Sequence, residues 1–134
     1  MQRYYTKCII GMRNHDYNKR RMFLNLPSLE FRRFRGDLIE MFKICNGIYD
    51  PSTTNSLFQF TDPHNITRTN GLKVTKIRHN TKMFKFFFTN RINNAWNNLP
   101  PDVVNASSTN LFKNKIDNIF HQYKFCTNLS LYYG

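Results

Sequence analysis

The stretch from Leu26 to Tyr49, LPSLEFRRFRGDLIEMFKICNGIY, most strongly limits what this chain can fold into. Ser28 is suited to cap a helix by accepting a backbone N–H, and Gly47 supplies the left-handed conformation that ends helices. Between them the apolar residues recur at spacings of three and four, which places them on one side of a helix: Phe31, Phe34, Leu38, Met41, Phe42 and Cys45. The stretch therefore predicts one long amphipathic helix with an aromatic stripe facing a core.

The same helix has a basic flank, because four positively charged residues fall largely off the stripe: Arg32, Arg33, Arg35 and Lys43. Two interpretations of this flank stay open, a solvated helix face and a surface that binds an acidic partner. Asp37 and Glu40 lie one turn apart on this helix. We interpret these carboxylates as ion-pair partners of Arg33, Arg35 or Lys43 rather than as a metal site or an acid–base pair.

The charge of the chain narrows the choice of partner. A chain of 134 residues with 13 Phe is the size of one domain, or part of a larger one, and its 40% hydrophobic content allows a modest core. The net charge of +12 attracts polyanions, so nucleic acid is the first partner to consider and an anionic membrane surface the second. No apolar run reaches the roughly 18 residues needed to span a bilayer. Of the two candidates we expect nucleic acid, and not a membrane, as the partner.

Residues that carry chemistry form no recognisable catalytic or metal site. The three cysteines, Cys8, Cys45 and Cys126, are far apart and lack zinc-site spacing, and Cys45 fits the core stripe. There is no glycine-rich phosphate loop, no zinc-protease helix motif and no nucleophile elbow, and no set of carboxylates converges for two-metal chemistry. The sequence predicts no enzyme activity for this chain on its own, no metal, no cofactor and no small-molecule substrate.

Two short helices are predicted before the long one. Gln2–Ile10 is ended by Gly11, and Tyr17–Leu24 is capped by Asp16. The first begins without a cap, so we expect that the chain is entered midway through an element and that its first methionine is a doubtful natural start. A turn at residues 25–27 then forms a helical hairpin, the outline of which is also that of a helix-turn-helix DNA-binding domain.

After the long helix the composition changes. Residues 50–70 are rich in Ser, Thr, Asn and Pro, which predicts a loop or linker that Leu57–Phe60 pins to the core. Gly71–Arg78 has the β-branched residues of one strand, which we expect to pair with an extended piece such as Lys82–Phe87.

Two further helices are predicted near the end of the chain. Met83–Leu99 contains Trp96 on its apolar stripe, as a core residue, and is stopped by the prolines at positions 100 and 101. Asp102–Asn105 is then a connector, and Thr109–Tyr123 is a last helix capped by Ser107 or Ser108. The expected fold class is mainly α, a helical hairpin plus C-terminal helices with a small β element. Its segments are 1–49, a linker at 50–70, 71–123, and a frayed tail at 124–134.

Two basic clusters interleaved with aromatic residues point to phosphate contacts. The first comprises Arg13, Lys19, Arg20, Arg21, Arg32, Arg33 and Arg35; the second comprises Arg68, Lys73, Lys76, Arg78, Lys82, Lys85 and Arg91. Such contacts give affinity without reading sequence. The residues predicted to bind nucleic acid are Arg20, Arg21, Arg32, Arg33, Arg35, Lys76, Arg78 and Arg91, with Tyr4, Tyr5 and Tyr17 as candidates for stacking on bases.

Four segments in order resemble the C-terminal region of non-LTR (LINE-type, Jockey-like) retrotransposon reverse transcriptases. They are MQRYYTKCIIGMRN, LNLPSLEFRRFRGDLIEMFKICNG, FFFTNRINNAWNNLPPDVVNA and SSTNLFKNKIDN, and they cover the chain to about Asn118. The most specific parts are LPSLE-x-RR-x-RGDLIE and NR-x-x-x-x-WN-x-LP. In that family this region follows the polymerase palm and thumb. The resemblance implies a helical, basic surface that helps to hold template RNA and target DNA.

The resemblance implies parentage rather than activity. The family's catalytic aspartates lie in an upstream FADD-type motif, and neither that motif nor the endonuclease domain occurs in this chain. We therefore expect a fragment of an RNA-directed DNA polymerase that begins at the end of the thumb. Its expected partners are RNA or DNA, through the phosphate backbone, and the missing polymerase core, inside a eukaryotic cell in nucleus and cytoplasm. Two alternatives stay open: a structural module that docks on the polymerase core, and a stand-alone helix-turn-helix domain.

Overall fold

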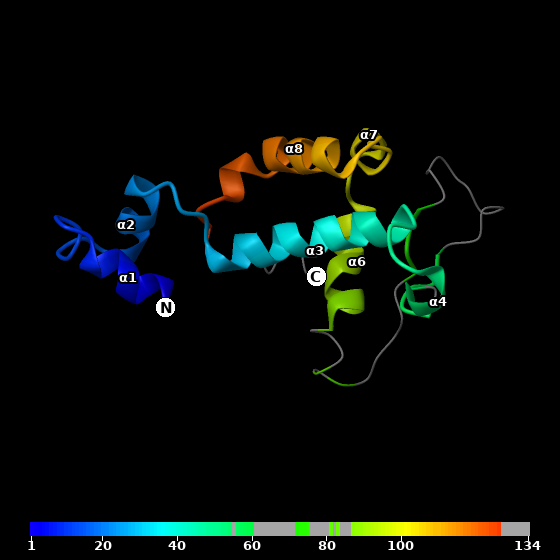
Figure 1. The fold of residues 1–134 in the computed structure, drawn as a ribbon, viewed down its shortest axis with the longest axis horizontal. Helices are drawn as coiled ribbons and strands as arrows, with labels where there is room; N and C mark the ends of the chain where they lie inside the picture. Colours follow the sequence, from blue (N-terminus) through cyan, green and yellow to red (C-terminus); the bar gives the residue numbers. More distant parts are fainter. Residues whose placement is uncertain (55, 61–71, 76–80, 82, 84–86, 127–134) are drawn as a thin grey trace.

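The fold is built around one long helix, α3 (Leu29–Cys45). A computed structural model describes residues 1–54, 56–60, 72–75, 81, 83 and 87–126 of the chain. These residues are mainly helical, which confirms the predicted fold class in its main feature. α3 runs through the middle of the molecule, with the other helices against its sides and at its two ends (Figure 1).

Local signals set the limits of α3. The Ser28 side chain accepts a hydrogen bond from the Phe31 N–H at 3.0 Å, which satisfies one of the free donors of the first turn. At the other end Gly47 has a φ of +64°, and the Ile48 N–H donates to the Lys43 carbonyl at 3.0 Å. This is the Schellman pattern of helix ends. The cap at Ser28 and the stop at Gly47 are thus confirmed.

Both short helices predicted before α3 are present, but they pack on each other as a hairpin, whereas the sequence predicts a hairpin of the second short helix with the long one. α1 (Gln2–Cys8) packs against α2 (Tyr17–Phe23), and the Asp16 carboxylate caps α2 by accepting from the Asn18 N–H at 3.0 Å. α2 ends where Asn25 takes a left-handed φ of +51°, a conformation that asparagine tolerates better than most residues. The hairpin lies at the end of the molecule where α3 begins (Figure 1).

The core forms where α6 (Phe88–Asn97) and α8 (Thr109–Ile119) pack on α3. α8 lies alongside α3 and runs in the opposite direction (Figure 1). The ring of Phe42 on α3 stacks on Phe112 of α8 at 4.3 Å between centroids. Trp96 is 2% exposed and donates its indole N–H to the Leu72 carbonyl at 2.9 Å, so its predicted place in the core is confirmed. Aromatic burial of this kind supplies much of the core's apolar area.

The predicted strand is reduced to one isolated antiparallel bridge, between Phe60 and Val74, and the described residues contain no β-strand. The reason is visible at Val74. Its N–H donates to the Asn97 side-chain oxygen at 3.0 Å, and its carbonyl accepts from the Asn97 amide at 2.9 Å. An α6 side chain therefore takes the place of a neighbouring strand. Residues 71 and 76–78 of the predicted strand, and most of its expected partner, lie outside the described residues.

The connections contain more helix than the sequence predicts. The predicted linker begins with α4 (Pro51–Thr54), and the predicted connector after Trp96 contains α7 (Pro101–Val104). Pro101 cannot continue the preceding helix. It begins α7 instead, because proline fits the first position of a helix. Further along the linker, Phe58 is buried in the core as predicted.

The last predicted helix is divided in two. α8 is capped by Ser108, whose side chain accepts from the Leu111 N–H at 3.2 Å, and a short 3-10 helix, η2 (His121–Tyr123), follows it. Residues 124–126, assigned from the sequence to a frayed tail, instead return to the start of α3. The Lys124 carbonyl accepts from the Ser28 N–H at 2.9 Å. The end of α8 is thereby tied to the start of α3.

Candidate nucleic-acid interface

Arg32 and Arg33 lie on the solvent side of α3, directly after the buried Phe31. Both are exposed, and neither side chain has a hydrogen-bond or ion-pair partner within the part of the chain that the structure describes. The positive charge of this helix turn is therefore open to solvent. This is the basic flank that the sequence predicts on the long helix.

Arg35 has a different environment from its two neighbours. Its Nε and Nη2 atoms donate to the two carboxylate oxygens of Asp117 on α8, at 2.6 and 2.8 Å. Such a two-point pair is strong and directional, and the hydrogen bonds from Asp117 raise the pKa of the Arg35 guanidinium. The charge of Arg35 is neutralised, and the residue joins α3 to α8 instead of facing solvent.

Arg91 on α6 is paired in the same way. Its Nε and Nη2 atoms donate to the Asp37 carboxylate on α3, at 2.8 and 2.7 Å, and Asp37 is 8% exposed. The sequence predicts that Asp37 pairs with Arg33, Arg35 or Lys43 on its own helix, and that prediction is wrong. The partner lies 54 residues away, because α6 crosses α3 at this turn.

Glu40 has the expected partner. Lys43 donates to its carboxylate at 2.8 Å, and the Tyr49 hydroxyl also donates to it. These two bonds hold the pKa of Glu40 below its usual value. The hydrogen bonds that Lys43 donates to Glu40 and to the Tyr49 hydroxyl raise the pKa of Lys43. Lys43 is thus neutralised, like Arg35 and Arg91.

Arg20 does not lie on the surface where the sequence analysis placed it. It is 2% exposed, and its Nε donates to the Thr6 hydroxyl at 3.2 Å while its Nη atoms donate to the carbonyls of Arg3 and His15. A residue held in this way closes the hairpin by tying α2 to α1. It is therefore not available for phosphate contacts.

Arg21 is likewise buried, at 1% exposed, which corrects its predicted role as a surface contact. Its Nη2 atom donates to the Asn18 side chain at 2.8 Å and to the Phe125 carbonyl at 3.1 Å. Its guanidinium group also lies 5.1 Å from the centre of the Tyr17 ring, an arrangement that stabilises a cation against an aromatic face. Arg21 therefore fastens the end of the described chain to the hairpin.

The aromatic candidates for stacking divide in two groups. Tyr17 is half-buried, and Arg3 and Arg20 lie near its ring as well as Arg21, so cations already occupy its surroundings. Tyr4 and Tyr5 are 69% and 61% exposed and contact each other edge to face. Only this second pair keeps ring surface open to solvent.

The second basic cluster is mostly not described. Lys76 and Arg78, two of the predicted contacts, lie outside the described residues, as do Arg68, Lys82 and Lys85. Of its remaining members, Lys73 is exposed and Arg91 is paired. Among the described residues, the exposed cations without an ion pair include Arg32 and Arg33 on α3, Lys7, Arg13 and Lys19 on the hairpin, and Lys73.

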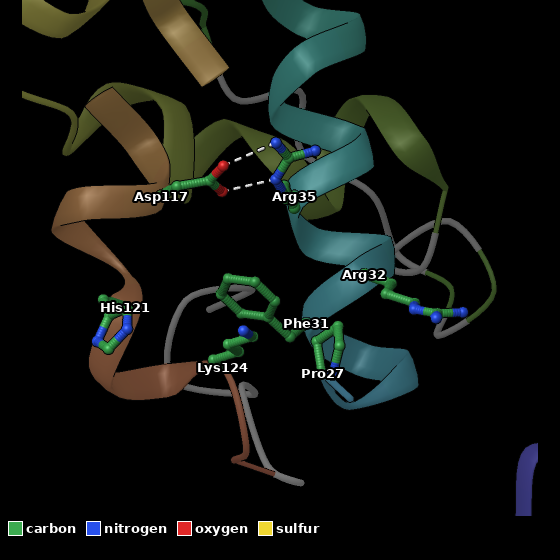
Figure 2. A pocket seen from close by; sticks show the side chains of 7 residues that line it. All are labelled: Pro27, Phe31, Arg32, Arg35, Asp117, His121 and Lys124. Atoms are coloured by element: carbon green, nitrogen blue, oxygen red, sulfur yellow. Dashed lines mark hydrogen bonds and ion pairs between the residues drawn. The ribbon is translucent and has the colours of Figure 1, made fainter. Parts of the chain in front are cut away.

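A pocket that the sequence analysis missed lies where the start of α3 faces the end of α8. Its volume is about 380 Å³, and it is lined by Pro27, Phe31, Arg32, Arg35, Asp117, His121 and Lys124. Figure 2 shows the Arg35–Asp117 pair between the two helices at one end of this pocket, with His121 on the α8 side and Phe31 and Pro27 on the α3 side. The residues at the start of α3 and those at the end of α8 are far apart in the sequence. They meet only because the two helices pack together, so no sequence pattern predicts the pocket.

Other kinds of site find no support among the described residues. No group of three or more His, Cys, Asp and Glu there is placed to hold a metal ion, and no described helix is long and apolar enough to cross a membrane. Burial raises the pKa of the Cys45 thiol to about 12, so this residue is a core thiol rather than a nucleophile. α2 packs mainly on α1 rather than on α3, and so adds nothing in favour of a helix-turn-helix reader.

Compared with protein-family models, with curated proteins and with solved structures, the chain has no match.

Proposed function

We propose that this chain holds nucleic acid by its phosphate backbone, as the C-terminal region of a non-LTR, Jockey-like reverse transcriptase, and that it catalyses no reaction by itself. The observation that carries the proposal is the pair Arg32 and Arg33, exposed on α3 and without a carboxylate partner in the described part of the chain. Phosphate groups bind such uncompensated cations and release counterions as they do so.

The surface around this pair supports the proposal. Exposed cations without an ion pair among the described residues also occur on the neighbouring hairpin: Lys7, Arg13 and Lys19. The hairpin and the start of α3 lie at the same end of the molecule (Figure 1). Carboxylates neutralise Arg35, Lys43 and Arg91 elsewhere. The exposed cations at this end attract a polyanion, and the resemblance in sequence gives the reason why RNA or DNA is the polyanion.

The test is a double charge reversal, Arg32→Glu with Arg33→Glu, measured by fluorescence anisotropy against an RNA hairpin and duplex DNA over a range of salt concentrations. We expect affinity to fall by about tenfold or more at low salt. The slope of log affinity against log salt should lose roughly one unit for each phosphate contact removed. Both residues are solvent-facing, so the far-ultraviolet circular dichroism should not change.

The matched control reverses the same number of charges elsewhere, with Lys73→Glu and Lys113→Glu. If this control lowers affinity and slope as much as the Arg32 and Arg33 variant, binding follows net charge and the proposed interface is wrong. Arg35 is left out of the test because Arg35→Glu would place two carboxylates together at Asp117 and separate α3 from α8.

A second candidate is the structural docking module, and one observation favours it. The hairpin exposes a set of large apolar side chains: Tyr4, Tyr5, Ile10, Met22 and Phe23. Exposed apolar surface of this kind commonly marks an interaction site. This candidate predicts that RNA and DNA bind no more tightly than a scrambled polyanion, and that Met22→Ser with Phe23→Ser weakens capture of the upstream polymerase region without changing salt-dependent binding.

A further inference from the structure

The pocket between α3 and α8 has two unlike walls. The α3 wall has the side chains of Pro27 and Phe31, and the α8 wall has the exposed imidazole ring of His121. Lys124 lies between the two walls, and Arg32 extends from α3 on the side away from Asp117 (Figure 2). A small planar group that enters this pocket therefore meets apolar and aromatic surface, with cations beside it.

The pocket carries an excess of positive charge. Arg35 is paired with Asp117, and the guanidinium of Arg32 extends away from the pocket (Figure 2), so the excess positive charge of the pocket comes from Lys124. Both oxygens of Asp117 are occupied by Arg35. The Lys124 ammonium group donates to the neutral Asn25 amide at 2.8 Å, so its charge is not cancelled. An anionic group is therefore favoured beside Lys124.

The size of the pocket limits its ligand. A volume of about 380 Å³ is near the lower end of the range of small-molecule sites, which begins at roughly 300 Å³. Such a volume suits one nucleotide and not a paired stack of bases. A base in a duplex also cannot leave its neighbours without the free-energy cost of unstacking, whereas an unpaired base can.

We propose that this pocket binds one unpaired nucleotide of a single-stranded nucleic acid. Its base lies against His121 and the edge of Phe31, and its phosphate lies beside Lys124. The inference rests on the proposed function and adds to it a preference for strand form: the exposed α3 surface binds any phosphate backbone, while the pocket accepts only an unpaired base. Stacking on side-chain rings is the usual source of such affinity for single strands.

The experiment uses the full chain and two fluorescent probes, a single strand of about six nucleotides and a duplex with a similar number of phosphates. His121→Ala should lower affinity for the single strand by roughly tenfold, the loss expected for one stacked base, and leave duplex affinity almost unchanged. His121→Phe should retain single-strand affinity, because the ring is kept. Lys124→Gln should weaken single-strand binding severalfold.

The chain offers matched controls outside the pocket, His15→Ala at an exposed position of the hairpin and Lys113→Gln on α8. If His121→Ala behaves like His15→Ala, or lowers duplex and single-strand affinity equally, the pocket does not bind a base. A free nucleoside monophosphate, added as competitor, should displace the strand weakly, since it makes no other backbone contacts. Tighter binding of the free nucleotide than of the strand would overturn the assignment to a polynucleotide.

The outcomes also separate this inference from the proposed function. If the Arg32 and Arg33 reversal weakens duplex binding while the His121 and Lys124 variants match their controls, the α3 interface stands and the pocket assignment falls. If the unchanged chain binds no nucleic acid better than a scrambled polyanion, both fall together.

Discussion

Arg33 and Arg35 are two residues apart on α3, and their neighbours give them different roles. Arg33 faces solvent, whereas Arg35 is held by both oxygens of Asp117. The difference follows from the direction in which each side chain leaves the helix, since positions two apart point to different sides. Arg35 lies beside the apolar stripe and reaches α8. A basic residue in this chain therefore contributes to the surface or to the fold according to its angle on the helix.

The pKa of Glu40 tests directly whether this residue is paired with Lys43 and Tyr49 in solution. The Lys43 ammonium and the Tyr49 hydroxyl hold this pKa below its usual value of 4.5. Because the folded pKa is the lower one, Glu40 stabilises the native state fully above pH 4.5, and this contribution is lost as pH falls through the folded pKa. An NMR titration of the Glu40 carboxyl carbon should show the depressed pKa, and Lys43→Gln should raise it. A wild-type pKa at or above 4.5 would contradict the pairing.

Capping accounts for where the helices begin and end. The start of α3 is fixed by Ser28, that of α2 by Asp16 and that of α8 by Ser108, each of which accepts a backbone N–H from its own first turn. The length of α6 is a different matter. The sequence predicts a longer helix around Trp96, while α6 ends at Asn97, whose side chain bonds to the backbone of Val74. Helix starts thus follow local chemistry, and this helix end also serves a neighbouring segment.

The element-scale prediction concerns the cap of α3. Ser28→Ala removes the acceptor of the Phe31 N–H and should lower the free energy of unfolding by about 1 kcal/mol. Ser28→Gly should lower it by only a few tenths of a kcal/mol, because a glycine lets water reach the free donor. Ser107→Ala is the control, since Ser107 is exposed and adjacent to the true cap of α8, and its effect should stay within about 0.5 kcal/mol. Urea denaturation measures all three variants, and an equal effect of Ser28→Ala and Ser107→Ala would rule out the cap.

At the scale of the whole molecule, one core joins parts that the sequence analysis placed in separate segments. α3 comes from the first segment, and α6 and α8 come from the third, yet Phe42, Trp96 and Phe112 lie in one cluster. Two ion pairs cross the same boundary, Arg35 with Asp117 and Arg91 with Asp37. The two segments therefore share one core, and α3 buries its stripe against the later helices.

This arrangement predicts a single unfolding transition for the body of the molecule. Trp96, the only tryptophan, is 2% exposed at the junction of the segments, so its fluorescence reports on the shared core. Fluorescence and far-ultraviolet circular dichroism should give coincident midpoints in denaturant, as for a two-state domain. Asp37→Ala should move both midpoints down together, by roughly 2 kcal/mol of stability, because it leaves Arg91 without its carboxylate. Two separate transitions would show that residues 1–49 and 71–123 fold independently.

The sequence by itself determined the features that depend on a few neighbouring residues. The stripe from Phe31 to Cys45, the caps at Ser28 and Asp16, the left-handed stop at Gly47 and the core position of Trp96 all follow from local spacing and side-chain chemistry. Each of these signals acts over one or two turns of helix, so the residues that carry it are adjacent in the sequence and can be recognised there.

Only the tertiary structure decided which positive charges are exposed to solvent and which are buried or held in ion pairs. Arg35 meets Asp117 82 residues away, and Arg21 meets the Phe125 carbonyl 104 residues away. The pocket between Phe31 and His121 has the same origin. Such partners are set by how helices cross and which turns face each other, a property of packed shapes that no periodicity in the chain records. The number of positive charges follows from the sequence alone. Which of them stay exposed and can contact a partner depends on how the helices pack.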